Sequence, residues 1–249
     1  MKITAIIQAR MGSTRLPGKV LMDLGGETVL CRVVRRLRRA SMIQEVAVAT
    51  TESPRDEPII EACRQLGVAY FCGPEQDVLD RYFRAVQQFG SDAVVRITSD
   101  CPLIDPELVD QVVDSFVAHH ADFGCNVLPR KYPRGLDTEV FTAEALRKVW
   151  QLSDQPHQRE HVTSLFYERP GSFRHATVSG EQDYSCYRWT LDTPEDLCLI
   201  RAIYSHFEHR DDFAWREVLA LMERLPELAS LNAHIEQKPV RENENAQVY

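Results

Sequence analysis

Two hydrophobic periods alternate along the first half of the chain. Short β-rich runs occur at residues 3–7, 45–50, 68–71 and 93–98, and the segments between them carry apolar residues every three to four positions. Strand-like runs that alternate with amphipathic helices are typical of a parallel β-sheet with helices on its faces. The pattern therefore predicts an α/β domain.

Cap residues mark where the helices of this domain begin and end. Ser53 followed by Pro54 predicts a helix start, and Gly67 predicts the end of that helix. Apolar faces or cap residues predict helices in further segments: 28–39, 78–86, 105–120, 143–151, 157–168, 193–207 and 215–222, the last being the final helix.

The pattern loosens after residue 128. The stretch 129–140 contains two prolines and three cations and is predicted to be a loop that returns to a strand around 138–141. Further strands are expected near 173–178 and 185–191. We expect one domain over residues 1–237, followed by a polar tail at 238–249.

Composition restricts the class of protein. The net charge of -8 argues against a general nucleic-acid-binding surface, so an anionic ligand needs a local basic site. The seven cysteines form no CxxC pair, which indicates reduced thiols, and no apolar run approaches the roughly 20 residues of a membrane helix. We therefore expect a cytoplasmic protein that binds neither membrane nor nucleic acid.

Five arginines lie between residues 32 and 39, on a segment whose other side carries an apolar stripe. With that stripe available for the core, we interpret these arginines as a solvated helix face or a dimer contact rather than a nucleic-acid site.

A local basic site follows the first predicted strand, in "QARMGSTRLPGKVL" (8–21). Its glycines permit close backbone approach, and Arg10, Arg15 and Lys19 can donate charge-assisted hydrogen bonds to phosphate oxygens. The spacing matches neither a P-loop nor a dinucleotide fingerprint. The segment reads as a polyphosphate-binding loop, and the alternative is a solvated loop with scattered cations.

Two aspartates follow or end other predicted strands. Asp100 lies in "VVRITSDCPLIDP" and Asp192 in "RWTLDTPEDL", whereas Asp105 is placed to cap a helix. Each aspartate alone reads as a turn or cap residue. Together with the basic loop at the same edge of a sheet, they indicate a Mg²⁺ site beside bound phosphates.

These three stretches resemble the motifs of the cytidylyltransferase family that includes the 3-deoxy-manno-octulosonate and acylneuraminate enzymes. The branch named for spore coat polysaccharide biosynthesis protein F is the most similar, and "RGLDTEVF", "REHVT" and "HIEQKPV" are also typical of it. The resemblance runs from Ile3 to about Pro239. It implies a Rossmann-like, three-layer nucleotidyltransferase fold of the glycosyltransferase-A type, with a mixed, mainly parallel sheet.

The resemblance also implies roles for individual residues. Arg15, Lys19 and Asp100 are expected to be catalytic, and Asp100 and Asp192 to hold the metal. The expected nucleotide contacts are Gln8, Ala9, Arg10, Met11, Gly12, Ser13, Arg15, Lys19, Thr50, Asp80, Arg81, Thr98 and Ser99. Octulosonate enzymes usually have Gln and Gly at the places of Thr98 and Ser99, so this chain departs from them where the base is selected rather than where phosphates bind.

An acceptor site is expected in the second half of the chain. "PRGLDTEVF" contributes Arg134, Asp137 and Glu139, and "HQREHVT" contributes Arg159, Glu160 and His161. Acidic groups accept hydrogen bonds from sugar hydroxyls, and an arginine can bind a carboxylate. The alternatives are that Glu139 faces solvent on a strand and that His161 is a hydrogen-bonded structural residue. Residues 128–190 are expected to bind the acceptor and to contribute to dimerisation.

The expected activity is transfer of CMP from CTP to a sugar acid or related polyol, with release of pyrophosphate, by a homodimer acting in surface polysaccharide synthesis. A glycosyltransferase of similar fold that uses a nucleotide sugar is the alternative, although such enzymes normally carry a D-x-D motif, which this chain lacks. A third hypothesis is a non-enzymatic sugar-nucleotide sensor with an idle site.

Overall fold

The computed structural model describes residues 1–237, and the tail expected at 238–249 lies outside the described residues. Within that part, strands of one sheet are β1 (Ile3–Gln8), β2 (Glu45–Thr51), β3 (Ala69–Gly73), β4 (Ala93–Thr98), β5 (Phe123–Cys125), β6 (Glu139–Thr142) and β7 (His175–Thr177). The runs expected at 3–7, 45–50, 68–71 and 93–98 all form strands, as their hydrophobic pattern predicts.

The strands are ordered β3-β2-β1-β4-β6-β5-β7 in the sheet. The first four pair in parallel, β6 runs antiparallel to both β4 and β5, and β7 pairs in parallel with β5. Because β6 is reversed, its first residues lie beside the last residues of β4, with Glu139 opposite Arg96. The sheet is mixed and mainly parallel, as predicted.

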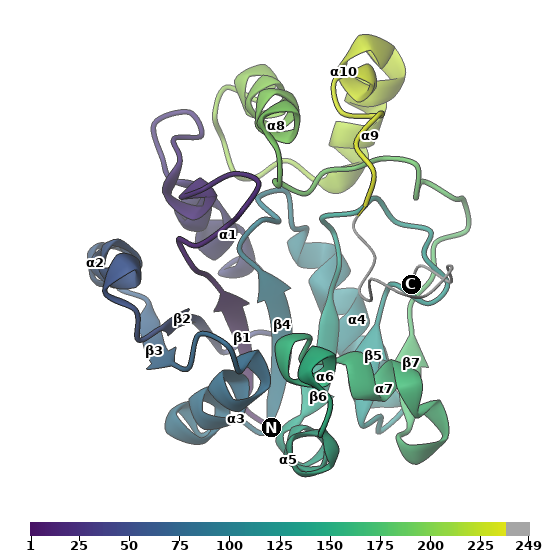
Figure 1. Ribbon diagram of the computed structural model, residues 1–249. Coiled ribbons are helices and arrows are strands. Elements are labelled where there is room, and N and C mark those ends of the chain that lie inside the picture. The colour runs from purple at the N-terminus through teal and green to yellow at the C-terminus, as the bar shows by residue number, and fades with distance from the viewer. Residues whose placement is uncertain (238–249) are drawn as a thin grey trace.

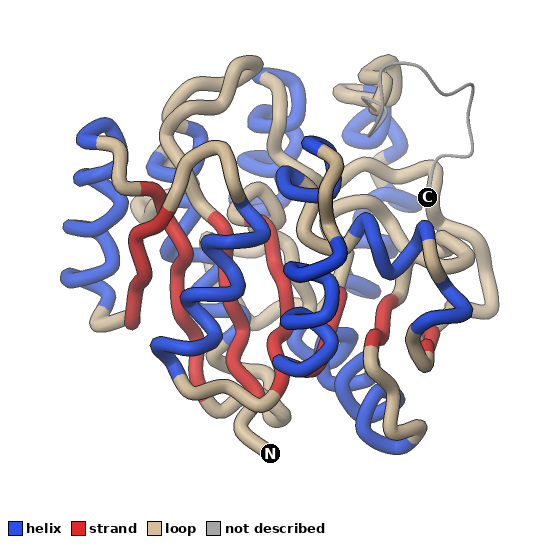
Figure 2. The backbone as a smooth tube through the Cα atoms, turned by 60° about the horizontal axis from the view of Figure 1, so that its bottom comes forward, coloured by secondary structure: helices blue, strands red, loops and turns tan. Residues whose placement is uncertain are grey.

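Helices cover both faces of the sheet and its upper end (Figure 1). They are α1 (Val29–Leu37), α2 (Glu57–Leu66), α3 (Val78–Phe89), α4 (Pro106–Ala118), α5 (Ala143–Leu152), α6 (Pro156–Glu160), α7 (Ser164–Glu168), α8 (Pro194–His206), α9 (Trp215–Arg224) and α10 (Pro226–Ser230), with 3₁₀ turns η1 (Lys19–Leu21), η2 (Pro54–Asp56) and η3 (Pro170–Ser172). Figure 2 shows the strands as one row with helices lying across it. The result is a three-layer α/β/α arrangement.

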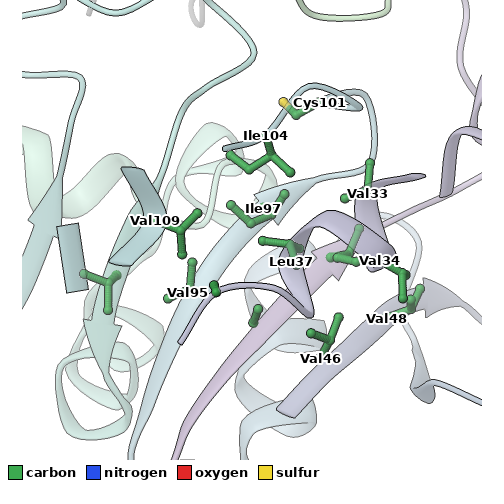
Figure 3. Close-up of a cluster of buried hydrophobic side chains, with 14 of the residues drawn as sticks. Val33, Val34, Leu37, Val46, Val48, Val95, Ile97, Cys101, Ile104 and Val109 are labelled. Carbon is green, nitrogen blue, oxygen red and sulfur yellow. The ribbon is translucent and has the colours of Figure 1, made fainter. Parts of the chain in front are cut away.

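Alternate residues of each strand supply the two faces. One buried cluster joins the sheet to α1, α2 and α4, and another joins the opposite face to α3, α5 and α7. Figure 3 shows side chains of α1, β2 and β4 gathered in the first cluster: Val33, Val34, Leu37, Val46, Val48, Val95 and Ile97. Burial of each such side chain stabilises the fold by roughly 1.5–3 kcal/mol.

A third buried cluster lies beyond the carboxyl ends of the central strands. Leu16 and Leu24 from the first connection pack there with Trp189 and Leu191, and with apolar residues of α8 and α9. Figure 1 shows α8, α9 and α10 above the arrowheads of β1 and β4. This cluster brings the segment before α8 close to the loop after β1.

The predicted caps are confirmed. Ser53 accepts a hydrogen bond from the Arg55 amide, and Gly67 ends α2 at φ 56°. The Asp105 carboxylate accepts from the Leu108 amide at 3.0 Å, as a cap of α4, and also from the Trp215 amide at 2.8 Å. One carboxylate therefore joins the starts of α4 and α9.

Three expectations about secondary structure are wrong. The helix expected at 157–168 is two helices, because His161 adopts an extended backbone (φ -106°, ψ 94°) that ends α6. No strand forms near 185–191, since the Trp189 amide donates to Arg134 O at 2.7 Å and the Leu191 amide donates to Asp100 O at 2.8 Å, two separate segments. The helix from Trp215 is followed by a further one, α10.

The expectation of a solvated arginine face is wrong for Arg32 and Arg36, which are buried. Arg36 donates to the carbonyls of Ile104 (2.7 Å), Asp211 (3.0 Å) and Phe213 (3.0 Å). Arg32 likewise donates to carbonyls and to Asp211. Both guanidinium groups thus fasten α1 to the loop between α8 and α9.

The cysteines and the lengths of the helices can also be compared with the sequence. All seven cysteines are free, in agreement with the absence of paired spacings. Among residues 1–237, no helix is both long and apolar enough to cross a membrane.

Replacement of Arg36 by Met should lower the free energy of unfolding by about 2–4 kcal/mol, because buried carbonyls then lose a charged donor. The matched control is Arg35→Met on the same helix, where the side chain is 45% exposed and pairs with Glu27; it should change stability by less than ~1 kcal/mol. Urea unfolding measures both, and equal losses would contradict the assigned role of Arg36.

Candidate functional site

The loop after β1 folds around one carbonyl group. The amides of Ser13 and Gly18 both donate to Met11 O, at 2.9 and 3.1 Å. Gly18 has φ 71°, a conformation that favours glycine, and it places Lys19 at the start of η1. The basic loop is thus a compact turn at the carboxyl end of β1, as its position in the sequence predicts.

Lys19 connects the three predicted motifs. Its ammonium donates to Asp100 Oδ2 at 2.8 Å, to Asp192 Oδ1 at 2.7 Å and to the carbonyl of Leu191 at 2.8 Å. Asp100 follows β4 and Asp192 precedes α8, so residues far apart in the chain meet at one nitrogen. The predicted convergence of the basic loop and the two aspartates is observed.

A buried network supports Asp192 from behind. Arg188 donates to Asp192 Oδ2 at 2.8 Å and forms two bonds to Asp196, at 3.0 and 3.2 Å. Asp196 is fully buried and accepts from the Asp192 and Thr193 amides, at 2.9 and 3.0 Å. Arg188 and Asp196 were not among the predicted site residues, although both lie in "RWTLDTPEDL", at i-4 and i+4 from Asp192.

Charges in this cluster balance. Lys19, Arg188 and Arg15, whose guanidinium lies 2.9 Å from Asp192 Oδ2, face the carboxylates of Asp100, Asp192 and Asp196. An incoming anion therefore meets cations that are already positioned, and an incoming cation meets carboxylates that are already occupied.

The ion pairs outweigh burial in setting protonation. Burial by itself lowers the pKa of Lys19, but Asp100 and Asp192 raise that pKa above its ordinary value. Burial likewise acts to raise the pKa of Asp100, and Lys19 reverses this, so the Asp100 pKa is lowered. Both groups are ionised at neutral pH.

Asp100 and Asp192 fit a magnesium ion bound together with phosphates. Residues 1–237 contain no group of three or more His, Cys, Asp or Glu arranged to hold a metal. Mg²⁺ is usually held by one or two carboxylates plus substrate phosphates and water, rather than by a protein cage. The donor set therefore suits Mg²⁺ delivered with a nucleotide.

Asp56 anchors the basic loop and was also missed. Its buried carboxylate accepts from the Met11 amide at 2.7 Å and from the Thr51 hydroxyl at the end of β2. The sequence alone indicates only that Asp56 lies near a helix start. It ties the loop to β2 and α2.

The other predicted nucleotide contacts fall into two groups. Arg81 is buried near Arg10, Asp56 and Glu75, and it donates to the Pro74 carbonyl at 2.8 Å. The Asp80 carboxylate instead accepts a hydrogen bond from Trp150 Nε1 at 2.9 Å and forms an ion pair with Arg84 at 2.7 Å. Arg81 therefore joins the basic loop, and Asp80 joins α3 to α5.

The remaining nucleotide candidates surround the ends of β1, β2 and β4. The Ser99 amide donates to Gln8 O at 3.1 Å, and the Thr98 hydroxyl lies 3.2 Å from Cys101 Sγ. The Thr50 hydroxyl is buried and has no hydrogen-bond partner among the described residues. Ala9 is buried, and Gly12 and Ser13 are half-buried on the loop.

Glu139 belongs to a buried ionic network, so the alternative that it faces solvent is wrong. It accepts from Arg96 at 2.6 Å and from the Tyr167 hydroxyl at 2.5 Å. Arg96 also donates to Gln8 Oε1 at 3.1 Å, which links the predicted acceptor residue to the end of β1. Arg96 and Tyr167 were missed; a cation within a buried strand was the available signal.

The other predicted acceptor residues are dispersed. Asp137 is held by both terminal nitrogens of Arg130, at 2.7 and 2.8 Å. Arg134 is half-buried beside Arg130 and Arg188, and no described acid lies within ion-pair distance of it. Burial and the charges of Arg130 and Arg188 lower its pKa, and Asp137 opposes this shift.

The α6 residues differ in exposure. Arg159 donates to Asp77 at 2.9 Å and to the Trp150 carbonyl at 3.1 Å, so it joins α6 to α3 and α5. Glu160 is exposed. His161 is half-buried near Arg96 and Glu139, and burial lowers its pKa. Of these three residues, His161 lies near the Glu139 network.

Known proteins match the chain over almost its whole length. The family model described as Cytidylyltransferase matches residues 4–242. Spore coat polysaccharide biosynthesis protein SpsF of Bacillus subtilis is 33% identical over 237 residues, 92% of this chain and 97% of that protein. The 3-deoxy-manno-octulosonate cytidylyltransferase of Geobacter metallireducens is 37% identical over 120 residues, 47% of this chain and 46% of that protein.

Among solved structures, a cytidylyltransferase from Leptospira borgpetersenii superposes with a TM-score of 0.90. It is 34% identical in sequence, and the match covers 95% of this chain and 100% of that one. The α/β nucleotidyltransferase fold implied by the three motifs is therefore confirmed.

The Arg188–Asp196 pair allows a test of the network behind Asp192. Arg188→Met should lower the free energy of unfolding by about 3–5 kcal/mol, because buried carboxylates lose their cation. The double variant Arg188→Met/Asp196→Asn should recover part of the loss, with a coupling of at least ~1 kcal/mol in a double-mutant cycle. The same cycle on the exposed pair Arg210–Asp212 is the control. Additive losses at Arg188 and Asp196 would show that the two side chains do not act together.

Proposed function

This chain belongs to the cytidylyltransferase family, and we propose that it transfers CMP from CTP to a sugar acid or related polyol, with release of pyrophosphate. The observation that carries the proposal is the meeting of Lys19 with Asp100 and Asp192 at one nitrogen, at 2.8 and 2.7 Å. A basic loop and two metal-binding carboxylates at one sheet edge suit a metal-bound triphosphate.

The basic loop binds the triphosphate. Arg10, Ser13, Arg15 and Lys19 are the phosphate contacts, and the anchoring of Met11 by Asp56 keeps the loop amides in place. A hydroxyl of the acceptor attacks the α-phosphorus in line, and pyrophosphate is the leaving group. Such a transfer depends mainly on positioning and on stabilisation of charge, which Arg15 and Lys19 provide at the leaving phosphates.

Asp100 and Asp192 would hold Mg²⁺, which neutralises charge on phosphate oxygens when bound. Arg188 and Asp196 orient Asp192 for this role. The donor chemistry of the two carboxylates is the support for the metal, which remains a prediction.

The acceptor lies on the side of Glu139, next to the end of β1. The named substrate of the Geobacter relative is a sugar acid. Glu139, Asp137 and Glu160 are acceptors for sugar hydroxyls, and Arg134, which has no described acid partner, suits a carboxylate. His161, which lies near Glu139, belongs to the same side, whereas Arg159 is held by Asp77 and the Trp150 carbonyl and stays a predicted contact. A homodimer through residues 128–190 stays a prediction.

Replacement of Lys19 by Ala should lower turnover about 10²- to 10³-fold, the loss typical of one preorganised donor. Pyrophosphate release with CTP and the acceptor measures it. Arg39→Ala, a surface arginine outside the site, is the control. Unchanged turnover in the Lys19 variant would remove Lys19 from the reaction.

The reaction itself is tested with each of the four NTPs, Mg²⁺ and a panel of sugar acids and polyols. Pyrophosphate should appear only with CTP and the right acceptor, and chelation of the metal with EDTA should abolish its release, because the phosphates then lose their counterion. Release of a nucleoside diphosphate from a nucleotide sugar would instead favour a glycosyltransferase.

A further inference from the structure

The Lys19 ammonium lies where a divalent cation would have to bind. It stands between Asp100 Oδ2 and Asp192 Oδ1 at hydrogen-bond distance from both, and the Leu191 carbonyl accepts a third bond at 2.8 Å. The Lys19 side chain is only 12% exposed. All three hydrogens of the ammonium are therefore engaged, two of them on the oxygens expected to bind metal.

The second oxygen of Asp192 is also occupied. Arg15 and Arg188 lie 2.9 and 2.8 Å from Asp192 Oδ2. A free divalent ion that binds both Asp100 Oδ2 and Asp192 Oδ1 would have to displace the Lys19 ammonium and would bring two positive charges into a cluster whose charges already balance. The displaced ammonium would keep no anionic partner, because Asp100 and Asp192 are the acids within ion-pair distance of it in the described chain.

We propose that Lys19 takes the place of the metal in the nucleotide-free protein and leaves it only when a triphosphate supplies new anionic partners. This inference rests on the proposed function. The site then rejects free Mg²⁺ and accepts it together with the nucleotide, because the phosphates attract the ammonium while the carboxylates become available to the metal. Metal and nucleotide binding are thus coupled, and the coupling is reciprocal.

Equilibrium dialysis with Mn²⁺ tests the proposal without any turnover. The wild-type protein should retain Mn²⁺ at least tenfold more tightly in the presence of CTP than in its absence. Lys19→Met should bind Mn²⁺ without nucleotide at least tenfold more tightly than the wild type, since both carboxylate oxygens are released. Addition of Asp100→Asn to Lys19→Met should abolish that gain.

Two matched variants distinguish the effect of a cation between the two carboxylates from the effect of positive charge elsewhere. Lys19→Arg keeps a cation between the carboxylates and should still exclude Mn²⁺. Arg39→Met removes an exposed positive charge outside the cluster and leaves the ammonium in place, so its nucleotide-free affinity should stay within about threefold of the wild type.

Equal nucleotide-free affinity of the wild type and Lys19→Met would overturn the proposal. So would tight binding of Mn²⁺ by the wild type that CTP does not improve, a result that needs no variant to fold. The pyrophosphate assay on the wild type tests the proposed function separately: activity with CTP together with equal Mn²⁺ affinities would reject the role of Lys19 alone.

Discussion

The site depends on the balance of charge among side chains that the fold buries wholly or in part. Three cations and three carboxylates meet beyond the carboxyl ends of the central strands, and they come from the loops after β1 and β4 and from the segment around the start of α8. A buried charge is tolerated only when it is paired, so each segment fixes the place of the others. The apolar cluster of Leu16, Trp189 and the helices α8 and α9 holds these segments together and shields the pairs.

Much of the fold could be predicted because its information is local. The strands β1, β2 and β4 are mostly apolar, β-rich runs, and the caps Ser53, Asp105 and Thr193 act within a single turn. The short strand β5 has three residues, too few for a period, whereas β7 lies within the strand expected near 173–178. The segment near 185–191 has strand-like residues, yet its amides donate to two different loops instead of to a neighbouring strand. These partners are set by the tertiary structure and are not visible in the local sequence.

The same distinction applies to the site. Lys19, Asp100 and Asp192 could be found because they lie in long motifs next to strand ends. Asp56 could not be found, because its role is to accept a hydrogen bond from the Met11 amide, 45 residues away in the chain. The burial of Arg36 could not be predicted for a related reason. It depends on the carbonyls of Asp211 and Phe213, which lie 175 and 177 residues further along the chain and accept its hydrogen bonds.

The reversed strand β6 interrupts the parallel part of the sheet. The loops that carry Lys19 and Asp100 follow parallel strands, whereas Glu139 stands at the beginning of a strand that follows the long connection from β5. Residues 126–138 lead to Glu139 and also pair with the segment before α8, because the Arg134 amide donates to Tyr187 O at 3.0 Å and the Trp189 amide donates to Arg134 O at 2.7 Å. A change in this connection that alters the surroundings of Glu139 therefore also bears on the position of Arg188, which holds Asp192.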